Sequence, residues 1–194
     1  MSLPTASNLP IQSFATPEAW EDWLGVHSGE PDGIWIKIAK KGSGIPTVTY
    51  EEALDVALCY GWIDGLLRSI NAQYYMQKFT PRRSKSLWSK RNISKVTELI
   101  AAGRMQPSGL AAIDAAKADG RWAMAYDPPT TMQMPDDYKS ALASNPAAKA
   151  HYETLNKTNV YAILWRIQTA KNPATRKQQI ETLVAMLAAG KHIH

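Results

Sequence analysis

The sequence predicts an α+β fold, in which a small antiparallel sheet packed with helices is followed by a helical C-terminal half. Three observations carry this prediction. Apolar residues alternate over 33–40, which is the period of a half-buried strand. Residues 66–70 and 74–80 have the composition of two further strands joined by a short turn at 71–73. From Ser89 onward the apolar residues recur at helical spacing instead.

We expect three consecutive parts: an extended lead-in over residues 1–16, an α+β core over 17–126, and a C-terminal helical region over 127–194 that packs on the core as one unit. A chain of 194 residues with 45% hydrophobic and 20% charged residues can bury a sizeable core. No apolar run approaches the roughly 18 to 20 residues that span a bilayer, and the start lacks the regions of a signal peptide. We therefore expect a cytoplasmic protein without a membrane span.

Capping patterns define the first elements. Thr16 and Pro17 predict a helix start, with threonine as the N-cap and proline in the first helical position. The strand over 33–40 then places three isoleucines on one face: Ile34, Ile36 and Ile38. The glycine- and serine-rich loop over 41–46 lacks the glycine spacing and the ending of a phosphate-binding P-loop.

Thr49 and Glu52 match the capping box, in which each side chain satisfies the backbone N–H of the other residue. This pattern predicts a helix over 50–60, and Gly61 suits the left-handed residue that ends it. We expect residues 61–65 to form a turn that leads into the predicted hairpin.

The region after the hairpin is predicted to be helical. One helix begins between Ser86 and Asn92 and stops at Gly103, and Pro107 opens another that runs towards Gly120. The predicted apolar face of the first of these helices consists of Ile93, Val96 and Ile100.

Three prolines mark helix starts in the last third of the chain: Pro135, Pro146 and Pro173. Asn145 and Asn172 are the predicted N-caps before the second and third prolines, and residues 130–134 form an exposed connector. The last two helices carry apolar residues at positions i, i+3, i+4 and i+7. These residues are Val160, Ile163, Leu164 and Ile167 in one helix, and Ile180, Leu183, Val184 and Leu187 in the other.

Positive charge is concentrated in one segment. The formal net charge is +5, yet no acid lies between Asp64 and Glu98, where eight of the 22 lysines and arginines are found. The rest of the chain therefore holds 14 cations against 17 acids. Such local charge can attract an anionic partner, although it does not identify that partner.

The centre of this basic segment, Arg82 and Arg83, lies at a predicted junction between a strand and a helix. Guanidinium groups and free helix N–H groups can bind the same anion at such a junction. A solvated basic edge is the alternative interpretation. In the binding hypothesis, Trp62 and Trp88 form the sides of the site, and Asp64 orients Arg82 or Arg83. The full set of predicted ligand-binding residues is Trp62, Asp64, Arg82, Arg83, Lys85, Ser86, Trp88 and Lys90.

Cys59 and Asp64 are the candidate reacting groups. Cys59 lies near the C-terminal end of a predicted helix, where the helix dipole disfavours a thiolate, so a buried structural cysteine is the favoured interpretation. Asp64 can accept N–H groups within its own turn, pair with Arg82 or Arg83, or act as an acid or base. Catalysis is the least favoured of these roles, because no histidine lies nearby in sequence.

We predict an anionic small molecule or a phosphate group as the partner, and the oligomeric state is left open. Nucleic acid stays an alternative, because aromatic residues interleave with cations over 74–90, although no known nucleic-acid-binding motif is present. No cofactor and no metal site are predicted, since the single cysteine is separated in sequence from all four histidines.

The leading hypothesis is therefore a non-enzymatic binding protein. One alternative is an enzyme that acts on an anionic substrate, with Cys59 or Asp64 as the reacting group. Another is a docking module whose basic face binds an acidic protein.

Several motifs follow one another in a fixed order along the chain: ALCYGWIDG (57–65), FTPRR (79–83), WSK (88–90), GRM (103–105), GRW (120–122) and TR (175–176). In these motifs the chain resembles the bacterial YdeI/OmpD-associated family, also called bacteriocin-protection proteins. The resemblance implies protection against bacteriocins or cationic antimicrobial agents, and it carries over no catalytic residues. The family name also implies an association with an outer-membrane porin, but a cytoplasmic protein, as expected here, would not contact such a porin directly.

Overall fold

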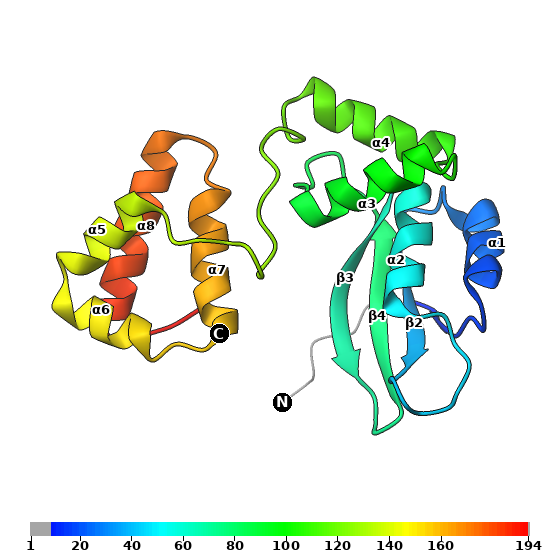
Figure 1. The fold of residues 1–194 in the computed structure, drawn as a ribbon, viewed down its shortest axis with the longest axis horizontal. Helices are drawn as coiled ribbons and strands as arrows, with labels where there is room; N and C mark the ends of the chain where they lie inside the picture. Colours follow the sequence, from blue (N-terminus) through cyan, green and yellow to red (C-terminus); the bar gives the residue numbers. More distant parts are fainter. Residues whose placement is uncertain (1–8, 194) are drawn as a thin grey trace. The chain divides into compact units, whose positions relative to one another are not determined.

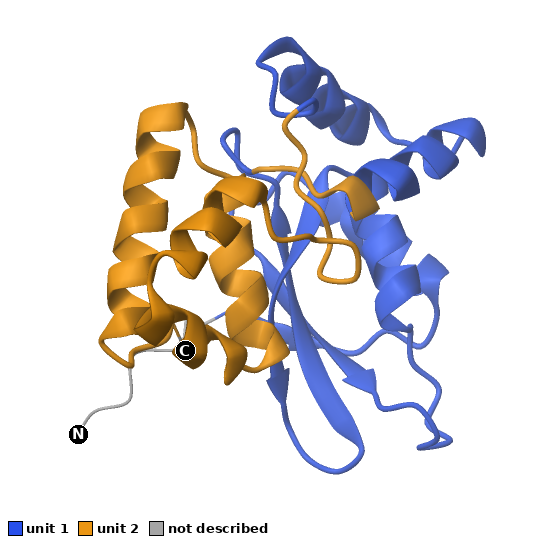
Figure 2. Cartoon of the chain, turned by 60° about the vertical axis from the view of Figure 1, so that its left-hand side comes forward, with its two compact units in different colours: residues 1–86, 92–123 blue, residues 87–91, 124–194 orange. Residues whose placement is uncertain are grey.

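The computed structural model describes residues 9–193. Within them the chain forms four strands and eight helices, which confirms the predicted α+β fold (Figure 1). The contacts divide the chain into two compact units, coloured separately in Figure 2. Unit 1 holds the residues up to Ser86 together with Asn92–Ala123, and unit 2 holds Leu87–Arg91 together with the residues from Met124 onward.

Unit 1 contains the sheet, whose strand order is β1-β2-β4-β3. Its elements are β1 (Ile11–Gln12), α1 (Pro17–His27), β2 (Ile34–Ala39), α2 (Tyr50–Cys59), β3 (Trp62–Ser69), β4 (Tyr74–Pro81), most of α3 (Lys90–Ala101) and α4 (Pro107–Ala118). The pairs β2–β4 and β3–β4 are antiparallel, as predicted. The pair β1–β2 is parallel, so the expected lead-in contributes a short edge strand. The part of that lead-in over 1–8 lies outside the described residues.

Helices α1 and α2 pack on one face of the sheet (Figure 1). That face carries the three predicted isoleucines, which are fully buried: Ile34, Ile36 and Ile38. Trp20 of α1 has its ring 5.9 Å from that of Phe79 on β4, and its indole N–H donates to the carbonyl of Ala53 on α2 at 3.1 Å. One tryptophan therefore joins both helices and the sheet into a single core.

The predicted helix caps of unit 1 are confirmed. Thr16 accepts a hydrogen bond from the backbone N–H of Ala19 at the start of α1. At α2, the Thr49 side chain accepts from the N–H of Glu52, and the Glu52 carboxylate accepts from the N–H of Thr49 at 2.8 Å. Gly61 follows α2 with a φ of 75°, the left-handed conformation that ends the helix.

The expected turn over 61–65 is wrong, because β3 already begins at Trp62. The turn is confined to Tyr60 and Gly61, and Trp62 then pairs with Pro81 while its side chain is buried. The irregular step lies further along, between Asp64 and Leu67, where the register of β3 shifts. The buried amide of Gln77 donates to the carbonyl of Gly65 at 2.9 Å and so holds this bulge.

The predicted apolar face of α3 is shifted by one position. Val96 is buried as expected, but Ile100 is 43% exposed and Leu99 is 6% exposed. Both Leu99 and Ile100 lie at helical spacing from Val96, so the sequence permits either residue to be buried with it. Packing within the fold buries Leu99.

Unit 2 is helical, with α5 (Asp136–Ala143), α6 (Pro146–Glu153), α7 (Lys157–Gln168) and α8 (Pro173–Ala188). Asn145 and Asn172 are N-caps with Pro146 and Pro173 in the first turn, as predicted. Pro135 is instead the N-cap of α5, one position before the expected place. The core consists of Tyr138, Leu142, Ala148, Ile163, Leu164, Ile167, Ile180, Leu183 and Leu187. Among residues 9–193, no helix combines the length and apolar character needed to cross a membrane.

Candidate functional site

The basic loop, which we define as residues 82–86, follows β4 in unit 1. The N–H of Arg82 donates to the carbonyl of Gly61 at 3.0 Å, and the N–H of Ser86 donates to the carbonyl of Arg83 at 2.9 Å. Arg82 is half-buried, whereas Arg83 and Lys85 are exposed. The turn therefore presents a guanidinium and an ammonium group to solvent from a backbone that is hydrogen-bonded at both ends.

Arg121 anchors the far end of the basic loop. Its guanidinium donates to the carbonyl of Ser86 at 2.9 Å, and its Nε lies 2.7 Å from Oδ2 of Asp119. The hydrogen bond from Arg121 lowers the pKa of Asp119, so this carboxylate is committed to Arg121. Arg121 was recognised from the sequence only as part of the GRW motif, without an assigned role. The acid two residues earlier, Asp119, was the sequence signal that Arg121 forms a structural ion pair.

Trp62 and Asp64 have partners elsewhere in unit 1. Trp62 is 1% exposed and donates its indole N–H to the carbonyl of Ser28 at 3.0 Å. Oδ2 of Asp64 accepts a hydrogen bond from the hydroxyl of Tyr50 at 2.9 Å. Asp64 thus links the start of α2 to β3, a contact that the sequence did not indicate because it joins residues from different elements.

Trp88 and Lys90 belong to unit 2, in the short orange segment of Figure 2. The carbonyl of Trp88 accepts from the N–H of Tyr126 at 3.0 Å, and the N–H of Lys90 donates to the carbonyl of Tyr126 at 2.8 Å. Nζ of Lys90 lies 2.7 Å from Oδ1 of Asp127, and this contact is the main cause of the lowered pKa of Asp127. The predicted ligand-binding residues are thus divided between the units, and their binding role stays a prediction.

Cys59 is a buried cysteine, which confirms the favoured interpretation. Loss of solvation raises the pKa of its thiol to about 11. The group is therefore protonated near neutral pH, and a protonated thiol is a poor nucleophile. This environment argues against the enzyme hypothesis in which Cys59 reacts.

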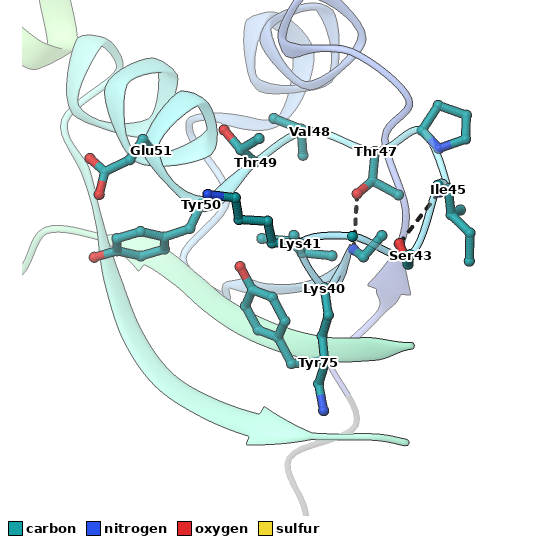
Figure 3. A pocket seen from close by; sticks show the side chains of 15 residues that line it. Lys40, Lys41, Ser43, Ile45, Thr47, Val48, Thr49, Tyr50, Glu51 and Tyr75 are labelled. Atoms are coloured by element: carbon teal, nitrogen blue, oxygen red, sulfur yellow. Dashed lines mark hydrogen bonds between the residues drawn. The ribbon is translucent and has the colours of Figure 1, made fainter. Parts of the chain in front are cut away.

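A pocket of about 800 Å³ lies in unit 1 between the 40–49 loop, the start of α2 and β4 (Figure 3). We call it the loop pocket. The strand and loop contribute apolar side chains, including the buried Ile38 and Val48. Tyr50 of α2 and Tyr75 of β4 contribute the rings.

Several polar groups around the loop pocket already have partners. The hydroxyl of Thr47 accepts from the N–H of Ala39 at 2.9 Å, and Nζ of Lys40 donates to the carbonyl of Asn71 at 2.8 Å. Thr49 is held in the capping box at the start of α2. These bonds fix the loop that forms one side of the pocket.

Lys41 and Tyr75 differ from those neighbours. In the part of the chain that the structure describes, no residue forms a hydrogen bond or ion pair with the Lys41 ammonium or the Tyr75 hydroxyl. Figure 3 shows the Tyr75 hydroxyl directed towards the Lys41 side chain. Burial raises the pKa of Tyr75, so its hydroxyl is a neutral hydrogen-bond donor near neutral pH.

Sequence reasoning missed the loop pocket. The loop over 41–46 does not match the P-loop pattern, so its sequence alone does not indicate a ligand site. Its lysines and glycines before a capped helix were the available local signal, but the contribution of Tyr75 depends on the sheet register, in which Tyr75 pairs with Ile38. Within residues 9–193, no cluster of three or more histidine, cysteine or acidic side chains is arranged to hold a metal ion.

Comparisons with known proteins give two family matches. Residues 12–112 match the family model described as a domain of unknown function, DUF8412. Residues 131–190 match the family model described as Bacteriocin-protection, YdeI or OmpD-Associated, in agreement with the resemblance seen in the motifs. No curated protein and no solved structure matches the chain.

Proposed function

This chain belongs to the DUF8412 family of domains of unknown function, and we propose that its unit 1 binds an anionic, phosphate-bearing ligand through the basic loop. The observation that carries the proposal is the exposed pair Arg83 and Lys85 on a turn that is fixed by backbone hydrogen bonds and by Arg121. A loop that is already ordered loses less conformational entropy when it binds a ligand.

The charge around the basic loop favours a ligand with more than one negative charge. The exposed Arg83 and Lys85 add two positive charges, while Arg121 and Asp119 neutralise each other. Arginine forms paired hydrogen bonds with phosphate oxygens, and lysine adds a mobile charge. A phosphate or polyphosphate group is therefore the chemistry that this loop fits.

The test is a binding assay with labelled nucleotides and short oligonucleotides, followed by fluorescence anisotropy. We expect Arg83→Ala with Lys85→Ala to weaken the binding of the best ligand at least about tenfold, because charged hydrogen bonds are lost. The matched control is Arg104→Ala with Lys117→Ala, which removes an exposed arginine and lysine elsewhere in unit 1. That control should bind nearly as well as the unchanged protein.

Unaltered binding by the loop variant would contradict the proposal, and so would an equal loss in the control, which would indicate attraction by net charge alone. Absence of binding to every phosphate compound at low salt would also contradict it. Binding of polyglutamate but of no phosphate compound would favour the alternative of a docking module for acidic proteins.

We also propose that unit 2 contributes to protection against bacteriocins, supported by the family match over residues 131–190. The test is to express the full chain in a bacteriocin-sensitive bacterium and to measure survival against bacteriocin concentration. Increased survival that is lost in a variant with unfolded unit 2, such as Leu164→Asp in its core, is expected. Equal survival with and without the protein would refute this role.

A further inference from the structure

The loop pocket has the physical character of a site for a flat apolar ligand. Its volume of about 800 Å³ lies in the usual range for small-molecule sites, which combine apolar walls with a few polar groups that orient the ligand. Ile38 and Val48 supply apolar surface, and Tyr50 and Tyr75 supply ring surface from two different elements. A ligand ring can pack against such rings in offset or edge-to-face geometry.

The charged groups of the pocket fit a ligand with a single negative charge. Lys40, Lys41 and Glu51 are the charged residues among those that line it, which gives a net charge of +1. Lys40 is engaged with the carbonyl of Asn71, so Lys41 is the cation available to a ligand. Glu51 is held by Lys95 at 2.9 Å and would repel a second negative charge on the ligand.

The start of α2 also disfavours phosphate. Helix N-termini bind phosphate through free backbone N–H groups. At α2 the Glu52 carboxylate accepts the N–H of Thr49, and the Thr49 hydroxyl accepts the N–H of Glu52. Because a carboxylate of the protein already occupies this end of the helix, a dianionic group would meet repulsion there.

We propose that the loop pocket binds an aromatic monocarboxylate, with its ring between the apolar floor and the tyrosines and its carboxylate on the Lys41 ammonium and the Tyr75 hydroxyl. The site is distinct from the basic loop and takes a different class of ligand. The proposal is based on two polar groups that line the same apolar cavity, the Lys41 ammonium and the Tyr75 hydroxyl. Neither has a hydrogen-bond partner among the described residues.

The probes are 2-naphthoate, its uncharged analogue 2-naphthalenemethanol and the non-aromatic carboxylate octanoate, titrated into the full chain labelled with nitrogen-15. We expect 2-naphthoate to shift the amide signals of residues 40–50 and of Tyr75, and to bind more tightly than either analogue. Lys41→Met should weaken this binding about tenfold or more, and Tyr75→Phe roughly two- to tenfold. Lys117→Met, at an exposed lysine of unit 1 outside both proposed sites, is the matched lysine control and should leave 2-naphthoate binding unchanged.

Three results would overturn the proposal: no shifts around the pocket, equal affinity for the uncharged or the non-aromatic analogue, or equal affinity in Lys41→Met. Both test variants keep most of the side-chain volume, and unchanged amide spectra without ligand confirm that they fold. The outcome is independent of the basic-loop proposal, because phosphate ligands should respond to Arg83→Ala with Lys85→Ala and should not respond to Lys41→Met.

Discussion

Gly109 is the position at which one added methyl group should have a large effect. It lies in α4, where that helix crosses the end of α2, and a Cβ built on it would be 2.1 Å from the carbonyl oxygen of Cys59 and 2.8 Å from Cε of Met105. The oxygen belongs to the backbone and cannot rotate away. Overpacking of this kind costs about 1 to 3 kcal/mol, and a contact this short places Gly109→Ala at the upper end, with a loss of about 2 to 3 kcal/mol in the free energy of unfolding.

Helix propensity predicts the opposite sign, since replacing glycine by alanine inside a helix stabilises it by about 1 kcal/mol when space allows. The assay is urea unfolding followed by tryptophan fluorescence and far-UV circular dichroism. Gly29→Ala is the control, because a Cβ at that glycine meets no atom within 4 Å. The control should change the free energy of unfolding by less than about 0.5 kcal/mol. A Gly109→Ala protein as stable as the unchanged protein, or more stable, would refute the close approach of α4 to α2.

Three further predictions concern buried or paired groups. Cys59 should react slowly with a thiol reagent at pH 8 in the folded protein and rapidly in urea, because its pKa is raised to about 11; fast labelling of the folded chain would contradict its burial. Arg176 lowers the pKa of Asp137, so their ion pair stabilises the fold near neutral pH and is lost as the pH falls through that lowered pKa. Asp137→Asn should therefore be less stable at pH 7 by up to about 1 kcal/mol, since the pair is partly exposed, and thermal unfolding at decreasing pH should show the difference disappear. Gln77→Leu should cost about 0.5 to 1.5 kcal/mol in urea unfolding, because the hydrogen bond to the carbonyl of Gly65 is lost, and unchanged stability would show that this amide does not hold the bulge.

The elements that the sequence predicted well depend on neighbours within a few residues. The capping box of Thr49 and Glu52 and the asparagine caps Asn145 and Asn172 involve a side chain and a backbone N–H three residues away. The isoleucine alternation in β2 reports the face of a strand in the same local way. Such patterns determine where an element begins and which side it buries.

The features that the sequence did not reveal depend on contacts between distant residues. The early start of β3 follows from the pairing of Trp62 with Pro81, and the exposure of Ile100 follows from packing that selects Leu99. The loop pocket likewise requires Tyr75 to lie opposite Ile38. Charge density along the sequence identified the basic loop, but it could not show that Trp88 and Lys90 belong to the other unit.

The placement of Leu87–Arg91 in unit 2 determines how the protein can be divided experimentally. The chain passes from one unit to the other after residues 86, 91 and 123, so the two units alternate along the sequence instead of following one another. A fragment that ends at Ala123 would keep this segment but lack Tyr126 and Asp127, which bind it in the whole protein. The family match over 12–112 likewise includes this segment, although its partners lie beyond the end of the match. A truncation at either boundary would therefore leave the Leu87–Arg91 segment without its backbone hydrogen bonds to Tyr126 and without the ion pair between Lys90 and Asp127.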